Sequence, residues 1–168
     1  ANGATLLLNR KNALPLAQGA KVSLFGTGSA DFVYGGTGSG SVDSSKALNL
    51  KDALEADGFS VNPTVWNFYT TGAGKGYRRQ LAPGSLNNYI FDNSGYLINE
   101  VPQSVFTDTE WASVADYGDA AIMVVSRVCG EGSDLPWFGT GDGDGNILSL
   151  SQEERDILKK LADLKAAG

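Results

Sequence analysis

Histidine is absent from the 168 residues of this chain, and cysteine occurs once. The lack of histidine excludes a Ser-His-Asp or Cys-His catalytic arrangement within the chain, and it disfavours a zinc site because zinc is often bound by histidine. The single cysteine excludes an intrachain disulfide framework and is compatible with a reducing compartment. Any acid–base catalysis must therefore depend on carboxyl groups.

Positive charge and long apolar runs are also scarce. The chain has 13 Lys and Arg against 19 Asp and Glu, a net charge of −6, and its only tight basic cluster lies in residues 75–79. Nucleic-acid binding needs clustered basic residues, and a membrane-spanning helix needs ~20 apolar residues. No signal segment opens the chain. We therefore expect no nucleic-acid or membrane partner and a cytoplasmic location, with secretion open if a signal has been lost.

A hydrophobic content of 42% with 19% charged residues is typical of one folded domain, which we assign to residues 1–168. Strands are predicted at residues 21–26, 59–62 and 120–125. Helices are predicted at residues 48–57 and 63–69, and capping boxes at residues 107–110 and 151–154 open two more, the second running to residue 166. Alternation of helices and strands predicts an α/β fold with a mostly parallel, doubly wound sheet.

Other parts of the chain carry weaker patterns. Residues 1–10 look like the tail of a helix, and the compositions of residues 26–45 and 70–80 indicate loops. Residues 81–103 show only turn signals. Trp66 and Trp111 fall in helical patterns, which places them in the core.

The most informative stretch begins with the apolar run at residues 120–125. Six uninterrupted apolar residues predict a strand buried on both faces. The next residues are polar and include Glu131 between Gly130 and Gly132. Ligands bind outside the carboxyl ends of strands in open α/β sheets, so Glu131 is a candidate functional carboxylate. A lone acidic residue after a strand is more often a helix cap or an ordinary loop residue, and the spacing alone does not decide between these roles.

Two loops have compositions found in ligand-binding loops, but the spacing of their glycine and acidic residues does not match those motifs. The glycines between residues 26 and 40 lack the third glycine of G-x-G-x-x-G, and no Gly-Lys-Ser/Thr follows them. Residues 142–153 place acidic groups at several calcium-loop positions, but Ile147 stands where that loop needs glycine. We therefore predict neither a cofactor nor a metal.

Three stretches of the chain carry a family pattern. Residues 126–134 read S-R-V-C-G-E-G-S-D, residues 11–16 read K-N-A-L-P-L, and residues 34–40 read Y-G-G-T-G-S-G. The first resembles the S-R-x-x-G-E-G-x-D stretch of family 3 glycoside hydrolases of the β-glucosidase type. The second is similar to the family's K-N-x-x-L-P-L stretch, and the third to the loop after the first strand in a bacterial subgroup. The three matches occur along residues 11–134 in the order expected for the family, and together they are specific.

The resemblance implies a three-layer α/β sandwich domain and assigns Glu131 as the general acid/base. It implies that the nucleophile is an aspartate on a separate barrel domain, so that the site is shared between domains. We predict substrate contacts for Arg127, Asp134 and Trp137. For Trp137 the expected contact is stacking on a sugar ring. For Arg127 an alternative is an ion pair that holds Glu131 or a neighbouring carboxylate, or one that is purely structural.

The resulting hypothesis is a partial domain of a retaining β-glucosidase-like enzyme, acting on a β-glucoside or a related oligosaccharide. The family's sheet has six strands, so the domain is expected to be incomplete at its C-terminal end, with the barrel absent. The isolated chain should be inactive and should self-associate through exposed edges. The alternatives are a non-catalytic docking or sugar-binding domain and a flavodoxin-like domain for a phosphorylated ligand.

Overall fold

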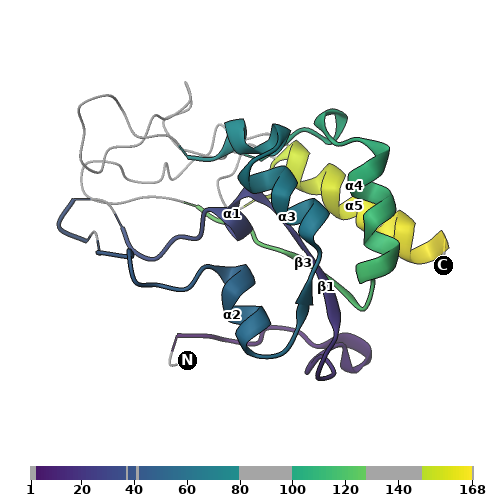
Figure 1. Ribbon diagram of the computed structural model, residues 1–168, viewed down its shortest axis with the longest axis horizontal. Helices are drawn as coiled ribbons and strands as arrows, with labels where there is room; N and C mark the ends of the chain where they lie inside the picture. The colour runs from purple at the N-terminus through teal and green to yellow at the C-terminus, as the bar shows by residue number, and fades with distance from the viewer. Residues whose placement is uncertain (1–2, 37, 41, 80–99, 128–148, 168) are drawn as a thin grey trace.

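The structure, a computed structural model, describes residues 3–36, 38–40, 42–79, 100–127 and 149–167. Within these residues it contains one sheet of three parallel strands in the order β2-β1-β3. The strands are β1 (Lys21–Phe25), β2 (Ser60–Val61) and β3 (Ala120–Met123). All three lie inside the segments predicted as strands, and the parallel α/β character of the fold is confirmed (Figure 1).

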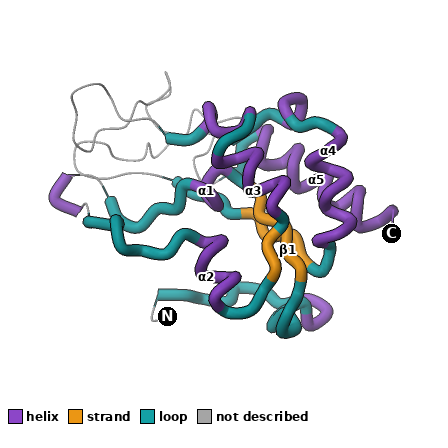
Figure 2. Tube along the Cα trace, viewed as in Figure 1, coloured by secondary structure: helices purple, strands orange, loops and turns teal. Residues whose placement is uncertain are grey.

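Helices connect and cover these strands, as the tube in Figure 2 shows. The α-helices are α1 (Thr27–Ala30), α2 (Leu50–Ala56), α3 (Pro63–Thr70), α4 (Asp108–Ser113) and α5 (Gln152–Ala167). Short 3₁₀ helices occur at η1 (Arg10–Asn12), η2 (Gly38–Gly40), η3 (Ala73–Tyr77), η4 (Gln103–Val105) and η5 (Val114–Tyr117).

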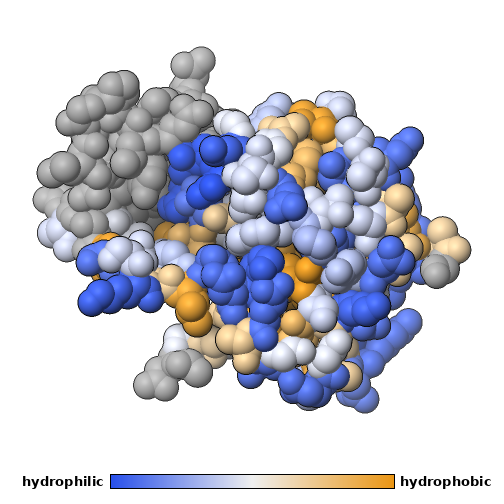
Figure 3. Space-filling view, viewed as in Figure 1, coloured by the Kyte–Doolittle hydropathy of each residue, from blue (hydrophilic) through white to orange (hydrophobic). Residues whose placement is uncertain are grey.

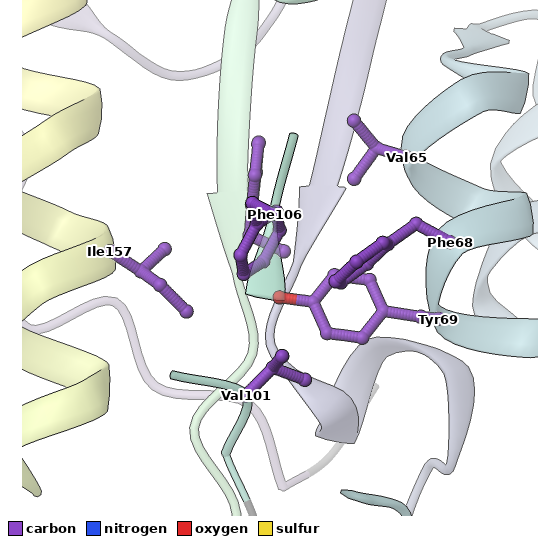
Figure 4. Packing of buried hydrophobic residues seen from close by; sticks show 7 residues of the cluster. Val65, Phe68, Tyr69, Val101, Phe106 and Ile157 are labelled. Carbon is purple, nitrogen blue, oxygen red and sulfur yellow. The ribbon is translucent and has the colours of Figure 1, made fainter. Parts of the chain in front are cut away.

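Alternate residues of β1 face two different hydrophobic clusters, as the two-residue period of a strand requires. Val22 and Leu24 pack in a cluster that includes Leu50 and Leu54 of α2. Phe25 packs in the other cluster, with residues of α3 and α5 and the adjoining loops: Val65, Phe68, Tyr69, Val101, Phe106 and Ile157 (Figure 4). Helices therefore cover both faces of the sheet, which is the doubly wound arrangement that the sequence predicted.

The central strand is β1, not the apolar run at residues 120–125. Every residue of β1 after Lys21 is buried, because the strand has hydrogen-bonded neighbours on both edges. β3 ends at Met123, and its residues are partly buried or exposed. The prediction of a strand buried on both faces is therefore wrong for residues 120–125. Within the described residues β3 has a neighbouring strand on one side only, and Val125 beyond its end is 43% exposed.

Local signals placed the helix starts well. Asn49 and Asn62 cap α2 and α3 through their side-chain oxygens, with Pro63 in the first turn of α3. Thr107 and Glu110 form the capping box of α4. Trp66 and Trp111 pack against the two hydrophobic clusters, as predicted, although each is only partly buried.

Three other expectations need correction. The helix predicted for residues 1–10 is not present over residues 3–9, where Leu6, Leu7 and Leu8 are exposed. The expected loop after β1 begins instead with the short helix α1, whose first three residues are buried. The expected loop at residues 70–80 contains η3.

Apolar groups reach the surface in several places among the polar ones, as Figure 3 shows for one face. Self-association of the chain stays a prediction.

Candidate active site

The carboxyl ends of β1 and β3 lie side by side. The N–H of Val124 donates to the carbonyl oxygen of Phe25 at 2.9 Å, so the two chains leave the sheet at the same level. The chain after β1 turns at Gly26 into α1, and the chain after β3 continues through Ser126 and Arg127 toward Glu131. This edge of the sheet is where α/β proteins usually place their ligands.

Two glycines allow these chains to approach each other closely. Gly26 has φ +87°, and a Cβ there would overlap the carbonyl oxygen of Val124. A Cβ on Gly28 would lie 2.8 Å from Ser126 Oγ and 3.0 Å from the Val124 carbonyl oxygen. The start of the glycine-rich region therefore packs directly against the segment that leads to Glu131.

A buried carboxyl group, Glu100, lies at the same edge. Its Oε2 accepts the N–H of Thr27 at 2.9 Å, and its Oε1 accepts the N–H of Val101 at 2.8 Å and the Tyr69 hydroxyl at 3.4 Å. The side chain of Tyr69 points inward from α3 (Figure 4), and its oxygen accepts the N–H of Gly26 at 3.0 Å. These bonds connect α3, the β1–α1 turn and the chain entering η4.

The electrostatics of Glu100 follow from its burial. Its residue is 7% exposed, and loss of hydration raises the pKa of the carboxyl group from 4.5 to about 7. The bonds from Val101 and Thr27 lower that pKa, and the charge of Glu154 raises it, but burial dominates. Burial, with the Glu100 charge second, also raises the pKa of Tyr69 well above 10.0. The pKa values of Glu100 and Tyr69 are thus both raised above their usual values.

Arg127 is the one predicted site residue inside the described part of the chain. Its guanidinium group donates to Oε1 and Oε2 of Glu154 at 2.8 and 2.9 Å, a bidentate ion pair. It also donates to the carbonyl oxygens of Ser126 and Ser149 at 3.0 and 2.8 Å. Of the alternatives for Arg127, the structure shows an ion pair with a carboxylate. A role in binding substrate stays a prediction.

The partner of Arg127 is fixed in turn by the helix that it opens. Glu154 Oε2 accepts the N–H of Ser151 at 2.8 Å, and the N–H of Glu154 donates to Ser151 Oγ at 3.2 Å, which is the capping box predicted from sequence. Glu154 is 3% exposed. The same carboxylate therefore caps α5 and binds Arg127.

A second ion pair joins two loops near the same edge. Nε and Nη2 of Arg79 donate to the two oxygens of Asp31 at 2.7 and 2.6 Å, and the N–H of Arg79 donates to Asp31 at 3.2 Å. Asp31 directly follows α1, and Arg79 follows η3. The pair fixes the chain that enters residues 80–99 against the chain that follows β1.

The other predicted site residues, Glu131, Asp134 and Trp137, lie outside the described residues. Residues 142–148 of the loop considered for calcium also lie outside them, and Glu153, its last candidate ligand, lies in the first turn of α5. Within the described ranges there is no group of three or more His, Cys, Asp or Glu side chains that could hold a metal ion. The same ranges contain no helix long and apolar enough to cross a membrane.

Sequence reasoning missed Glu100 and Tyr69. Glu100 belongs to residues 81–103, which show no hydrophobic period, and Tyr69 looked like the end of an amphipathic helix. Their pairing joins positions 31 residues apart, and the bond to Thr27 spans 73 residues. No local pattern reports such contacts.

Comparison with known proteins identifies the domain. Residues 4–167 match the model of the glycosyl hydrolase family 3 C-terminal domain. The chain belongs to this family. It is 34% identical over 134 residues to beta-glucosidase A of Butyrivibrio fibrisolvens, a match that covers 79% of this chain and 14% of that protein.

Solved structures of beta-glucosidases are similar to the chain. Beta-glucosidase 3B from Thermotoga neapolitana, in complex with α-D-glucose, matches 95% of this chain and 20% of its own length, with 25% identity and a TM-score of 0.68. A beta-glucosidase from Paenibacillus barengoltzii matches 93% of this chain and 16% of its own, with 26% identity and a TM-score of 0.62. The chain thus spans a fifth or less of the length of these beta-glucosidases.

Proposed function

We propose that this domain supplies Glu131 as the general acid/base of a retaining glycosidase that acts on β-glucosides, in a site shared with a barrel domain. The observation that carries the proposal is the family membership of residues 4–167 together with the S-R-V-C-G-E-G-S-D stretch at residues 126–134. Asp134 at the end of this stretch and Trp137 three residues beyond it are the proposed substrate contacts.

The carboxyl edge of the sheet supports this assignment. Among its described partners, Arg127 is held there by hydrogen bonds of 2.8 to 3.0 Å to Ser126, Ser149 and Glu154. Glu131 follows Arg127 by four residues, which span at most ~14 Å, and the proposal therefore assigns it to this edge. A retaining site needs its two carboxyl groups ~5 Å apart, which requires the barrel's nucleophile to face this edge.

The chemistry assigns two tasks to Glu131. It protonates the leaving oxygen while the glycosidic bond breaks and the nucleophile attacks the sugar. It then takes a proton from the water that hydrolyses the glycosyl-enzyme. The first task requires a protonated carboxyl group near neutral pH, so the pKa of Glu131 must exceed the ~4.3 of a free glutamate. Burial and the nearby nucleophile would both raise it.

The test is Glu131→Gln in the full-length enzyme. For an aryl glucoside whose leaving group needs no proton, kcat/KM should change little. For an alkyl glucoside or a disaccharide it should fall ~10²-fold or more, the usual scale of acid–base catalysis. The matched control is Glu55→Gln on α2, an exposed position whose change should leave both values intact.

An equal loss of kcat/KM for good and poor leaving groups would make Glu131 a structural or binding residue. That outcome would favour the alternative of a domain that docks on the barrel and shapes its cleft without taking part in proton transfer.

A further inference from the structure

The side chain of Arg127 joins two stretches of chain that are distant in sequence. From the end of β3 it reaches Ser149 and Glu154, at the start of α5. In the sequence, Arg127 directly precedes residues 128–148, which contain Glu131, and Ser149 and Glu154 follow them. One guanidinium group therefore fixes the chain that enters this segment to the chain that leaves it. Fixing both ends of a segment removes much of its conformational freedom.

Glu154, the partner of Arg127, is held in place by the fold. Glu154 is almost completely buried and caps α5 through Ser151. Three residues further along, Ile157 is fully buried in the cluster around Phe25. The orientation of the Glu154 carboxylate is therefore set by the core of the domain. Because the guanidinium group of Arg127 is planar and binds both carboxylate oxygens, the ion pair fixes the orientation of Arg127 as well as its distance from Glu154.

We propose that Arg127 and Glu154 form a positioning pair, which orients the segment carrying Glu131 so that its carboxyl group meets the leaving oxygen. This inference rests on the proposed function. In this proposal both residues are positioning residues and not catalytic ones. The pair acts through Glu131, and a misplacement of ~1 Å at a catalytic group is enough to cost ~10²-fold in rate.

Two other roles for the pair make different predictions. If Arg127 binds the sugar directly, its loss weakens every substrate that carries the same sugar, whatever the leaving group. If the pair only stabilises the fold, its loss lowers the thermal midpoint and the amount of active enzyme, again without regard to the leaving group. Only a pair that positions the general acid makes the loss depend on how much the leaving group needs a proton.

The experiment uses three variants of the full-length enzyme. Glu154→Gln leaves the shape and removes one charge, and Arg127→Lys keeps the charge and removes the bidentate geometry. A single change can leave a buried charge unpaired and unfold the domain, so the third variant is R127M/E154L, which removes both charges together. The control is Asp163→Asn, which breaks the exposed ion pair with Lys159 on the same helix.

Each variant is assayed for kcat/KM with a 2,4-dinitrophenyl β-glucoside and with an alkyl β-glucoside, beside its thermal midpoint. We expect the alkyl substrate to lose ~10²-fold and the aryl substrate less than ~10-fold in all three variants. The control should match the parent enzyme with both substrates. Equal losses for the two substrates, in variants that stay folded, would overturn the positioning role.

Glu131→Gln, assayed in parallel, separates this inference from the proposed function. If Glu131→Gln discriminates between the leaving groups and the pair variants do not, the positioning inference is wrong and the proposed function stands. If the pair variants discriminate and Glu131→Gln does not, the pair positions a different acid, and the assignment of Glu131 is wrong. If none discriminates, both are wrong.

Discussion

Replacing Glu100 with glutamine removes a buried carboxyl group whose pKa, about 7, lies well above the usual 4.5. Between these two values the folded chain keeps a proton on Glu100 that the unfolded chain has released. The stabilisation from this proton is fully present below pH 4.5 and is lost as the pH rises through 7. Glu100 should therefore make the domain less stable at alkaline pH than at mildly acidic pH.

The size of the effect follows from the pKa difference. From about pH 5 to about pH 8 the free energy of unfolding should fall by roughly 2–3 kcal/mol because of Glu100. At ~2 kcal/mol per molar of urea, this is a shift of ~1 M in the unfolding midpoint. Glu100→Gln has no titrating group there, so it lacks this pH dependence. The variant also loses one hydrogen-bond acceptor for the N–H of Thr27 or Val101. This loss lowers its free energy of unfolding by a similar amount at every pH.

The assay is urea unfolding of the chain and the variant at both pH values, followed by tryptophan fluorescence. The difference in unfolding free energy between the two proteins should change by roughly 2–3 kcal/mol between the two conditions, in favour of the variant at the higher pH. Glu55→Gln, at an exposed position, is the matched control, and its difference from the parent should change far less. A Glu100→Gln difference that is the same at both pH values would refute the reasoning from burial.

Two further predictions concern packing at the same edge of the sheet. Gly28→Ala should destabilise the domain by ~1–3 kcal/mol because its Cβ meets Ser126 Oγ and the Val124 carbonyl, and adding Ser126→Ala should recover part of the loss. If urea unfolding shows no recovery in the double variant, the loss of stability does not come from the contact with Ser126 Oγ. Asp31→Asn should cost ~1–3 kcal/mol because Arg79 loses a bidentate, largely buried partner. An unchanged thermal midpoint would show that this ion pair contributes nothing measurable.

The parts of the fold that sequence predicted are those set by local chemistry. The capping box at Thr107 and Glu110 acts within one helical turn, so it locates a helix start without knowledge of the rest of the chain. The apolar run at residues 120–125 located β3 but misjudged its surroundings. Burial depends on which strands lie on either side, and an apolar run carries no such information.

The candidate site divides in the same way. The capping box of α5 predicted that Glu154 binds Ser151, yet the second partner of Glu154, Arg127, is 27 residues away in sequence. Glu100 binds Thr27 across 73 residues. Contacts of this kind arise only when β1 and β3 are paired and α5 packs on the sheet. The helix predicted for residues 1–10 was wrong, and Leu6, Leu7 and Leu8 in this segment are exposed.

The central claim is that Glu131 serves as the acid/base, and azide rescue of Glu131→Ala in the full-length enzyme tests it most directly. With a 2,4-dinitrophenyl β-glucoside the leaving group departs without a proton, so the variant should accumulate its glycosyl-enzyme because no base activates water. Azide is already an anion and needs no base. The account predicts that azide accelerates turnover and that the product is β-glucosyl azide, with retained configuration. A variant that is slow, unaffected by azide and forms no glucosyl azide would contradict it.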